Sequence, residues 1–459
     1  MQESDDLSTV VTSAELIKDL ANDEIIDAQY SYIYYNLVPD GIAHIRDVWP
    51  DFVPDKDEAL EILKAFYTSH TGVIWGNDLI EEHNIGIEIR GSSSQYFPKK
   101  SYGFETWDEA GEDLDVSLAG YPEEEDWILY GPFSDKSLIR NVLIYRLSNL
   151  VGRYATKTSF YNLQINGVFL GLYVLMEKIK RDKNRVNISK NRSDDISGGY
   201  IIKIDKITGD GDTLNEKIAF MSEYTKDGIK GINKNVHFLY EYPKNRDISD
   251  EQKNYIQGYM RDFEDAIASE NFTSESDGYK KYIDVDSFID FFILNEITRN
   301  VDAYRISTFM HKDINEKLKM GPIWDFNIAF GNADYCEGGL TTGWAYKFNE
   351  ACPADGMLVP FWWDRLIQDP NFTQALRERW TSLRLNELSN SSIMGIVDEL
   401  VGELEDSDAI TQNFGKWLIL GTYIWPNNFV GNRHSEEITY LKEWIEGRLS
   451  WMDQEISKF

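Results

Sequence analysis

The sequence predicts an α+β protein with a sheet-rich front half and a helical back half. Between residues 85 and 205, short runs alternate apolar and polar side chains, as strands with one buried face do. After residue 285, longer segments repeat apolar residues every three or four positions, as amphipathic helices do. Strands followed by helices, rather than regular alternation of the two, are typical of α+β folds.

The strand predictions rest on local patterns. In 85–91 (IGIEIRG), Ile85, Ile87 and Ile89 share one face, and 101–107 (SYGFETW) is the expected partner. The segment 158–179 predicts a hairpin, because Asn166-Gly167 is a strong two-residue turn signal between two β-rich runs. Further strands are expected at 127–131, 198–205, 307–313 and 317–323.

The helix predictions rest on apolar spacing and on end signals. The segment 137–152 has a helical period and ends at Gly152, which suits a C-terminal cap. A short helix is expected at 13–21, begun by Ser13. Phe-rich 287–299 and two amphipathic segments, 393–404 and 438–452, complete the set. Lys136 and Arg140, one turn apart, are expected on a solvated helix face.

The composition excludes several classes of function. The net charge is 46 − 78 = −32, and such a surface repels nucleic-acid backbones and anionic membranes. No apolar run approaches the length that spans a bilayer. The first residues lack the basic and apolar regions of a signal peptide. The six His are scattered without a zincin pair, and no Gly-x-Ser-x-Gly elbow occurs.

The densest group of candidate functional residues lies between Asn295 and Asn332. A helix leads into a loop with Asp302, and two short strands follow, the second expected to end at Asp325. Two carboxylates at the ends of such a hairpin can face one cleft. Phosphoryl transfer needs one carboxylate near the acceptor hydroxyl and another that holds a metal on the phosphates.

Several motifs in order resemble the CotH (spore coat protein H) kinase family. They are IEIRGSSSQYFPKKSYGFE, DKSLIRNVLIYRLSN, FYNLQINGVFLGLYVLMEKI, NEITRNVDAY and KLKMGPIWDFNIAFGN, which together span roughly residues 85–332. The resemblance implies an atypical, two-lobed protein-kinase-like fold that uses ATP with Mg or Mn. It also implies a secreted or surface protein as the substrate. The expected division is an N-terminal extension at 1–84 and a kinase-like domain at 85–459, with an N-lobe at about 85–205, an insertion at about 206–250 and a C-lobe at about 251–459.

The resemblance also implies roles for single residues. Asp302 matches the catalytic aspartate, and Asp325 in WDFN matches the metal-binding aspartate. Ser307 stands where protein kinases have a metal-binding Asn, and Asn327 stands where many members of the family have a second Asp. Both departures weaken the expected metal set of Asp325, Asn327 and Ser307, and Asn300 is a possible replacement ligand.

Cations for a phosphate clamp flank the polar loop after residue 90. The resemblance favours Arg90 and Lys100 over Lys99, and Glu177 is expected to pair with the phosphate lysine or to lie under the adenine. The Gly-Asp run at 209–212 lacks the later ligands of an EF-hand and is expected in a surface loop.

Two other functions remain open from the sequence. A binding or scaffold protein on a kinase-like fold would explain Ser307 and Asn327, with Trp-rich 343–366 as a contact surface or as buried packing. A glycosidase carboxylate pair cannot be eliminated by counting, because 78 acidic residues offer many pairs. Without the resemblance, Asp302 would be an ordinary Asx-turn residue and Asp325 an ion-pair partner.

The two cysteines bear on the compartment. Cys336 and Cys352 are the only cysteines, and no His lies beside them, so a structural zinc site is excluded. Because the family is often secreted, a Cys336–Cys352 disulfide and an extracytoplasmic location are expected.

Overall fold

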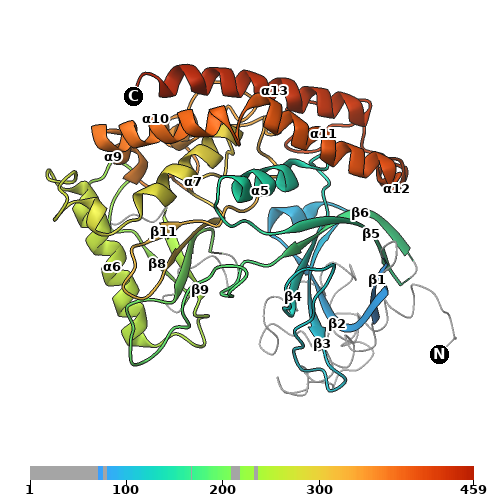
Figure 1. Cartoon of the computed structure of the whole chain (residues 1–459), viewed down its shortest axis with the longest axis horizontal. Helices are drawn as coiled ribbons and strands as arrows, with labels where there is room; N and C mark the ends of the chain where they lie inside the picture. Colours follow the sequence, from blue (N-terminus) through green and yellow to red (C-terminus); the bar gives the residue numbers. More distant parts are fainter. Residues whose placement is uncertain (1–70, 76–79, 167, 208–217, 232–235) are drawn as a thin grey trace, which may run out of the picture.

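The computed structural model describes residues 71–75, 80–166, 168–207, 218–231 and 236–459. Within these residues the strands form two antiparallel sheets, and helices follow them, which confirms the α+β prediction. In Figure 1 the first sheet lies at the lower right, the second at the lower left, and the C-terminal helices cross the top. The expected helix at 13–21 and the Gly-Asp run at 209–212 lie outside the described residues.

The first sheet has the order β1-β2-β3-β4-β6-β5. Its strands are β1 (Thr71–Trp75), β2 (Ile80–Arg90), β3 (Ser101–Trp107), β4 (Asp126–Tyr130), β5 (Thr158–Ile165) and β6 (Val168–Glu177). The β2–β3 pair and the β5–β6 hairpin are confirmed. Asn166 takes φ +50°, the left-handed conformation that the predicted turn requires. Because β1 pairs with β2, residues on both sides of the expected boundary at residue 85 share one sheet.

The second sheet has the order β11-β10-β7-β9-β8. Its strands are β7 (Tyr200–Ile204), β8 (Ala219–Met221), β9 (His237–Tyr242), β10 (Thr308–Lys312) and β11 (Lys319–Met320). Segment 206–250, expected as an insertion, supplies β8 and β9. The sheet therefore joins strands that are far apart in the sequence, and β7 lies between β9 and β10.

Helices fill the rest of the described chain. They are α5 (Arg140–Leu150), α6 (Asp250–Ala268), α7 (Val285–Thr298), α8 (Phe348–Ala351), α9 (Trp362–Ile367), α10 (Pro370–Leu385), α11 (Asn390–Asp406), α12 (Ala409–Lys416) and α13 (His434–Ile456). The segments predicted around α5, α7, α11 and α13 are confirmed. Gly152, at φ +88°, follows the end of α5 as expected.

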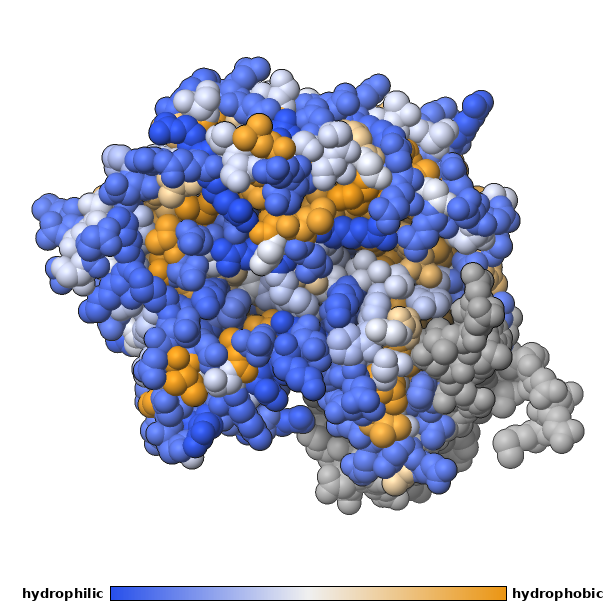
Figure 2. All heavy atoms as spheres, viewed as in Figure 1, coloured by the Kyte–Doolittle hydropathy of each residue, from blue (hydrophilic) through white to orange (hydrophobic). Residues whose placement is uncertain are grey.

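One large core joins α5, α7, the second sheet and the C-terminal helices. The surface in Figure 2 is mostly hydrophilic, with scattered apolar patches, because most large apolar side chains lie in this core. The expectation of a solvated face for Lys136 and Arg140 is wrong, since both are fully buried. Asp135 compensates Arg140 at 2.6 Å, which allows a charged side chain inside the core.

Candidate active site

Three aspartates converge beside the second sheet. Asp205 directly follows β7, Asp302 lies in the loop between α7 and β10, and Asp325 lies beyond β11. The pKa of Asp325 is raised to about 7, first by burial and then by the charges of Asp302 and Asp205. Like charges raise a carboxyl pKa in this way only when they are close together. Asp302 and Asp325 therefore lie within electrostatic reach of each other, and their sharing of one site stays a prediction. The second strand, β11, ends at Met320, before Asp325.

The Asp325 loop is anchored by α5. The Asp325 amide donates to Tyr145 Oη at 3.1 Å, and the Phe326 amide donates to Asn141 Oδ1 at 2.7 Å. Asp325 takes φ +66°, a conformation that a non-glycine residue adopts only when its surroundings enforce it. Because both backbone amides are held, the backbone that carries Asp325 has a fixed position. Among the described residues, no donor lies within hydrogen-bonding distance of that carboxylate.

Asn300 ties the two aspartate loops together. Its Nδ2 donates to the carbonyl oxygen of Asp325 at 3.1 Å, and its Oδ1 accepts from the Asp302 amide at 3.1 Å. From the sequence this side chain was considered as a replacement metal ligand. In the structure both of its polar atoms form hydrogen bonds with backbone groups. It therefore fixes the spacing of Asp302 and Asp325.

Asp302 has one direct cationic partner. Arg305 Nη2 lies 2.9 Å from Asp302 Oδ1. Burial raises the pKa of Asp302, the charges of Arg305 and Lys206 lower it, and Asp205 and Asp355 raise it. The net direction is upward, so this carboxyl holds a proton more readily than a solvated Asp does.

Cations approach the cluster from both sheets. Arg90, at the end of β2, lies over the Trp324 ring at 5.6 Å, and burial lowers its pKa against the opposing charges of Glu88, Asp325 and Glu241. From the second sheet, Lys206 lowers the pKa of both Asp302 and Asp325. The site thus combines clustered negative charge with a few positive groups, an arrangement that can hold a metal with a polyphosphate.

Asp205 and Lys206 were not among the residues predicted from the sequence, and they stand beside an ion-pair group. Lys203 lies 3.4 Å from Asp205 and 3.5 Å from Glu241 of β9. The available signal was the end of GGYIIKIDK, where a buried strand stops at an Asp-Lys pair. That pair gained meaning only when the sheet placed β7 beside β10.

Comparison with known proteins identifies the family. A family model described as CotH kinase protein matches residues 87–452, most of the chain. The chain belongs to the CotH kinase family. The match extends well beyond residue 332, where the sequence resemblance became weak, and includes α13. A search of curated proteins found no significant match.

The other residues proposed from the CotH resemblance lie as follows. Lys100 Nζ donates to the Gln95 carbonyl at 2.5 Å, and burial lowers its pKa. Lys99 is almost fully buried, with Nζ 2.8 Å from Asn413 Oδ1 of α12. Glu177, at the end of β6, accepts from Tyr154 Oη at 3.1 Å and from the Lys157 amide at 2.9 Å. Nucleotide contacts of Lys100 and Glu177 stay predictions.

Ser307 and Asn327 lie in the loops that carry the two aspartates. Both are half-buried, and Ser307 takes φ +49°. The Asn327 carbonyl accepts from Asn332 Nδ2 at 2.8 Å, which fixes the backbone beyond Asp325. Their roles as metal ligands stay predictions.

A second acidic cluster already has a lysine that offsets part of its charge. Within the described residues, the one group of three carboxylates whose oxygens lie within 4.8 Å of one another is Asp115, Glu124 and Glu125. The Lys180 ammonium lies 2.7 Å from Glu124, contacts Glu125, and lies 3.0 Å from Asp126. A protein cation therefore compensates the charge that a metal would compensate.

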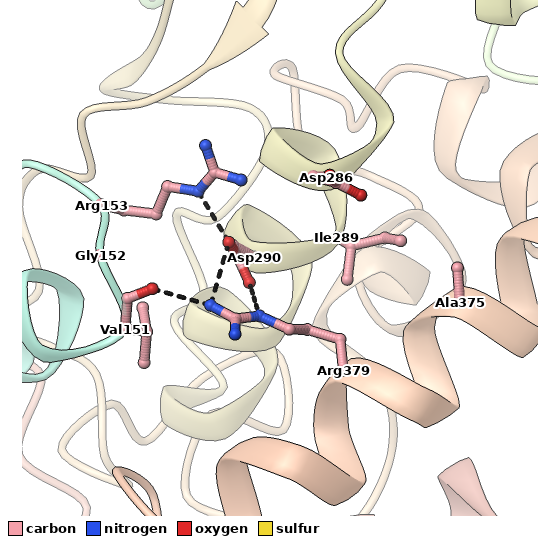
Figure 3. A pocket seen from close by; sticks show the side chains of 8 residues that line it. All are labelled: Val151, Gly152, Arg153, Asp286, Ile289, Asp290, Ala375 and Arg379. Atoms are coloured by element: carbon pink, nitrogen blue, oxygen red, sulfur yellow. Dashed lines mark hydrogen bonds and ion pairs between the residues drawn. The ribbon is translucent and has the colours of Figure 1, made fainter.

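A pocket of about 330 Å³ lies between the end of α5, α7 and α10 (Figure 3). Asp205, Asp302 and Asp325 are not among the residues that line it. Asp290 at its base pairs with Arg153 and Arg379, each at 2.7 Å. Arg379 also donates to the Val151 carbonyl at 2.7 Å. These contacts brace three segments of the fold, as Figure 3 shows.

The Trp-rich segment 343–366 is packed inside. Trp362 and Trp363 are 0% and 1% exposed, and Trp363 contacts Tyr304 with ring centres 4.6 Å apart. The hypothesis that this segment forms an aromatic contact surface is therefore wrong for these two residues. Among the described helices, none is long and apolar enough to cross a membrane.

Proposed function

We propose that this protein is an atypical protein kinase that transfers the γ-phosphate of ATP to Ser or Thr of a secreted or surface protein. One observation carries the proposal: Asp325 is half-buried, lies within electrostatic reach of Asp302 and Asp205, and has no hydrogen-bond donor on its carboxylate among the described residues. Such a group is costly unless it serves a function that uses it. A divalent cation is the natural counter-charge for this carboxylate, since carboxylate oxygens are the ligands that Mg and Mn prefer.

The residues divide the work of phosphoryl transfer. Asp325 and Asp205 would hold the metal, which neutralises charge on the phosphates when bound. Arg90 and Lys206 add positive charge from the two sheets. Asp302 would orient the acceptor hydroxyl and take its proton as the hydroxyl oxygen attacks phosphorus and ADP leaves. A raised pKa suits Asp302 to accept a proton near neutral pH.

The two-sheet layout supports a two-lobed kinase-like fold. Arg90 comes from the first sheet, whereas Asp205, Asp302 and Asp325 border the second. A nucleotide between these parts would contact both. The Cys336–Cys352 disulfide supports an extracytoplasmic location, because structural disulfides persist in oxidising compartments.

The test is phosphate transfer from γ-labelled ATP, with Mg²⁺ or Mn²⁺, to the protein itself and to a general Ser/Thr-rich acceptor. Asp302→Asn should retain nucleotide binding but lose at least about 100-fold in rate. Asp325→Asn should lose both, and Asp334→Asn, an exposed neighbour in sequence, should lose neither. Nucleotide binding without transfer in the wild type would instead favour the scaffold function that Ser307 and Asn327 suggest.

A further inference from the structure

Arg305 joins two carboxylates within the interior. Its Nη2 lies 2.9 Å from Asp302 Oδ1, and its Nη1 lies 3.2 Å from Asp355 Oδ1. Its Nε donates to the Val301 carbonyl at 2.8 Å, and its guanidinium lies 3.9 Å from the centre of the Phe348 ring. The side chain is 3% exposed. Arg305 is thus held on three sides, and one side is the Asp302 carboxylate.

Asp355 is itself held by a tight turn. Its amide donates to the Cys352 carbonyl at 3.1 Å, and its Oδ1 accepts from the Met357 amide at 2.8 Å. The position of Asp355 therefore depends on that of Cys352, three residues earlier. Through Arg305, the same turn bears on Asp302.

The disulfide fixes this turn to the chain beyond the Asp325 loop. Cys352 pairs with Cys336, with Cα atoms 5.4 Å apart. Next to Cys336, the pKa of Tyr335 is raised by burial and then by the charge of Asp302, so the two groups lie within electrostatic reach of each other. Tyr335 also stacks on Trp425, with ring centres 5.8 Å apart. Both ends of the disulfide thus lie in segments that border Asp302.

We propose that Arg305, Asp355 and the Cys336–Cys352 disulfide form a clamp that positions Asp302 for the acceptor hydroxyl. The clamp rests on the proposed function, since it assigns Arg305 and Asp355 as positioning residues for that reaction. Arg305 holds one oxygen of Asp302, and among the described residues no donor holds the other. That second oxygen is available to the hydroxyl. Neither a charge alone nor a packed ring alone would select which oxygen is offered.

Lysine and glutamine at position 305 separate geometry from charge. Arg305→Lys keeps the positive charge but cannot hold two carboxylates through two fixed nitrogens. The transfer rate should fall about tenfold or more, because small displacements of a catalytic group are costly, while the acid limb of the pH–rate profile stays in place. Arg305→Gln should lower the rate and move the acid limb to higher pH, since Arg305 lowers the pKa of Asp302. The other charged groups around Asp302, namely Lys206, Asp205, Asp325 and Asp355, are unchanged in both variants.

Asp355→Asn should move the acid limb of the pH–rate profile in the direction opposite to Arg305→Gln. Asp355 raises the pKa of Asp302, so its loss should move the acid limb to lower pH. If the clamp positions Asp302, the rate at the pH optimum should still fall about tenfold. Arg146 is the matched control, because its two Nη atoms also bridge two carboxylates, those of Glu399 and Glu403, on the outside of the protein. Arg146→Lys should leave rate and profile unchanged.

The role of the disulfide is tested by comparing the oxidised wild type with two other forms of the protein. One is the double variant Cys336→Ser/Cys352→Ser. The other is wild type treated with dithiothreitol, which reduces the bond to two thiols as the dithiol is oxidised. Both should transfer phosphate several-fold more slowly while binding Mn²⁺·ATP as tightly as the oxidised wild type. Hydrogen exchange of the amides at 301–306 provides a readout independent of turnover, and exchange should accelerate in Arg305→Lys, Asp355→Asn and the double serine variant. Unchanged exchange, or unchanged rates in a wild type that does transfer phosphate, would overturn the clamp. A wild type that binds no nucleotide would overturn the proposed function alone.

Discussion

Two acidic side chains in this molecule, Glu296 and Asp325, differ in how their charge is compensated. Glu296 on α7 accepts from Arg448 Nη2 of α13 at 3.0 Å, from Tyr304 Oη at 3.0 Å and from two backbone amides, of Ala345 and Tyr346. Asp325 has no donor on its carboxylate among the described residues, and the charges of Asp302 and Asp205 raise its pKa more than Arg90 and Lys206 lower it. Glu296 is fully buried and Asp325 is half-buried, yet only Glu296 has hydrogen-bond donors and a cation on its carboxylate.

The difference separates structure from function. A fully hydrogen-bonded buried ion pair keeps two elements together, here the end of α7 and the middle of α13. A buried acid among other acids stabilises nothing by itself and gains its counter-charge only from a ligand. Perturbation of the two sites should therefore have opposite effects on stability.

The largest effect on the free energy of unfolding is expected at the Glu296–Arg448 pair. Arg448→Met leaves Glu296 buried without its cation, and the free energy of unfolding should fall by about 3–5 kcal/mol. Urea denaturation measures this. The double variant Glu296→Gln/Arg448→Met should lose less than Arg448→Met alone, because no uncompensated charge remains. Equal losses would mean that the pair is held by packing rather than by charge.

At Asp325, the change in the free energy of unfolding should have the opposite sign. Asp325→Asn removes a charge that its surroundings oppose, so the free energy of unfolding at pH 8 should rise by about 1–2 kcal/mol. A folded-state pKa of about 7 lies above that of the unfolded chain, so this acid costs stability progressively as pH rises from about 4 to about 7. The gain in Asp325→Asn should accordingly vanish near pH 4. A loss of stability at pH 8 would contradict the account.

The affinity for a metal ion should depend on pH because of the protonation of Asp325. A cation and a proton compete for Asp325, so Mn²⁺ affinity should rise about tenfold between pH 6 and pH 8 if the pKa is about 7. Mn²⁺ titration followed by electron paramagnetic resonance measures the free ion directly. An affinity that is flat over this range would show that Asp325 is already ionised at pH 6.

The smallest effect is expected at an exposed ion pair. Arg146→Ala removes contacts to Glu399 and Glu403 on the surface, and the free energy of unfolding should change by no more than about 0.5 kcal/mol. Thermal or urea unfolding under the same conditions as for Arg448→Met provides the comparison. A change as large as that of Arg448→Met would remove burial as the explanation of the difference.

How far the sequence could predict the molecule depended on how local each signal was. The β5–β6 hairpin was predictable because Asn166-Gly167 encodes its turn, and α5 was predictable from its spacing and Gly152. The strands β8 and β9 were not, because three or six residues in a polar segment acquire strand identity only by pairing with β7. Arg140 was misjudged for a related reason: its burial depends on Asp135 as a partner.

The site divided along the same line. Asp302 and Asp325 stand in motifs that the CotH resemblance marks, so they could be selected from the sequence. Asp205 could not, because a lone strand-end aspartate has no distinguishing neighbour until β7 is placed beside β10. Asn300 was predicted as a possible metal ligand. The sequence could not predict that both polar atoms of its side chain form hydrogen bonds with the backbone of Asp302 and Asp325.

The most direct test of the central claim is calorimetric titration of the protein with ATP in the presence of Mg²⁺ or Mn²⁺, comparing wild type, Asp325→Asn and Asp334→Asn. We predict metal-dependent binding in the wild type and Asp334→Asn, and at least about a 100-fold weaker affinity in Asp325→Asn. Equal binding by all three, or no binding by a folded wild type, would contradict the claim that the uncompensated charge at Asp325 exists to hold a metal and a nucleotide.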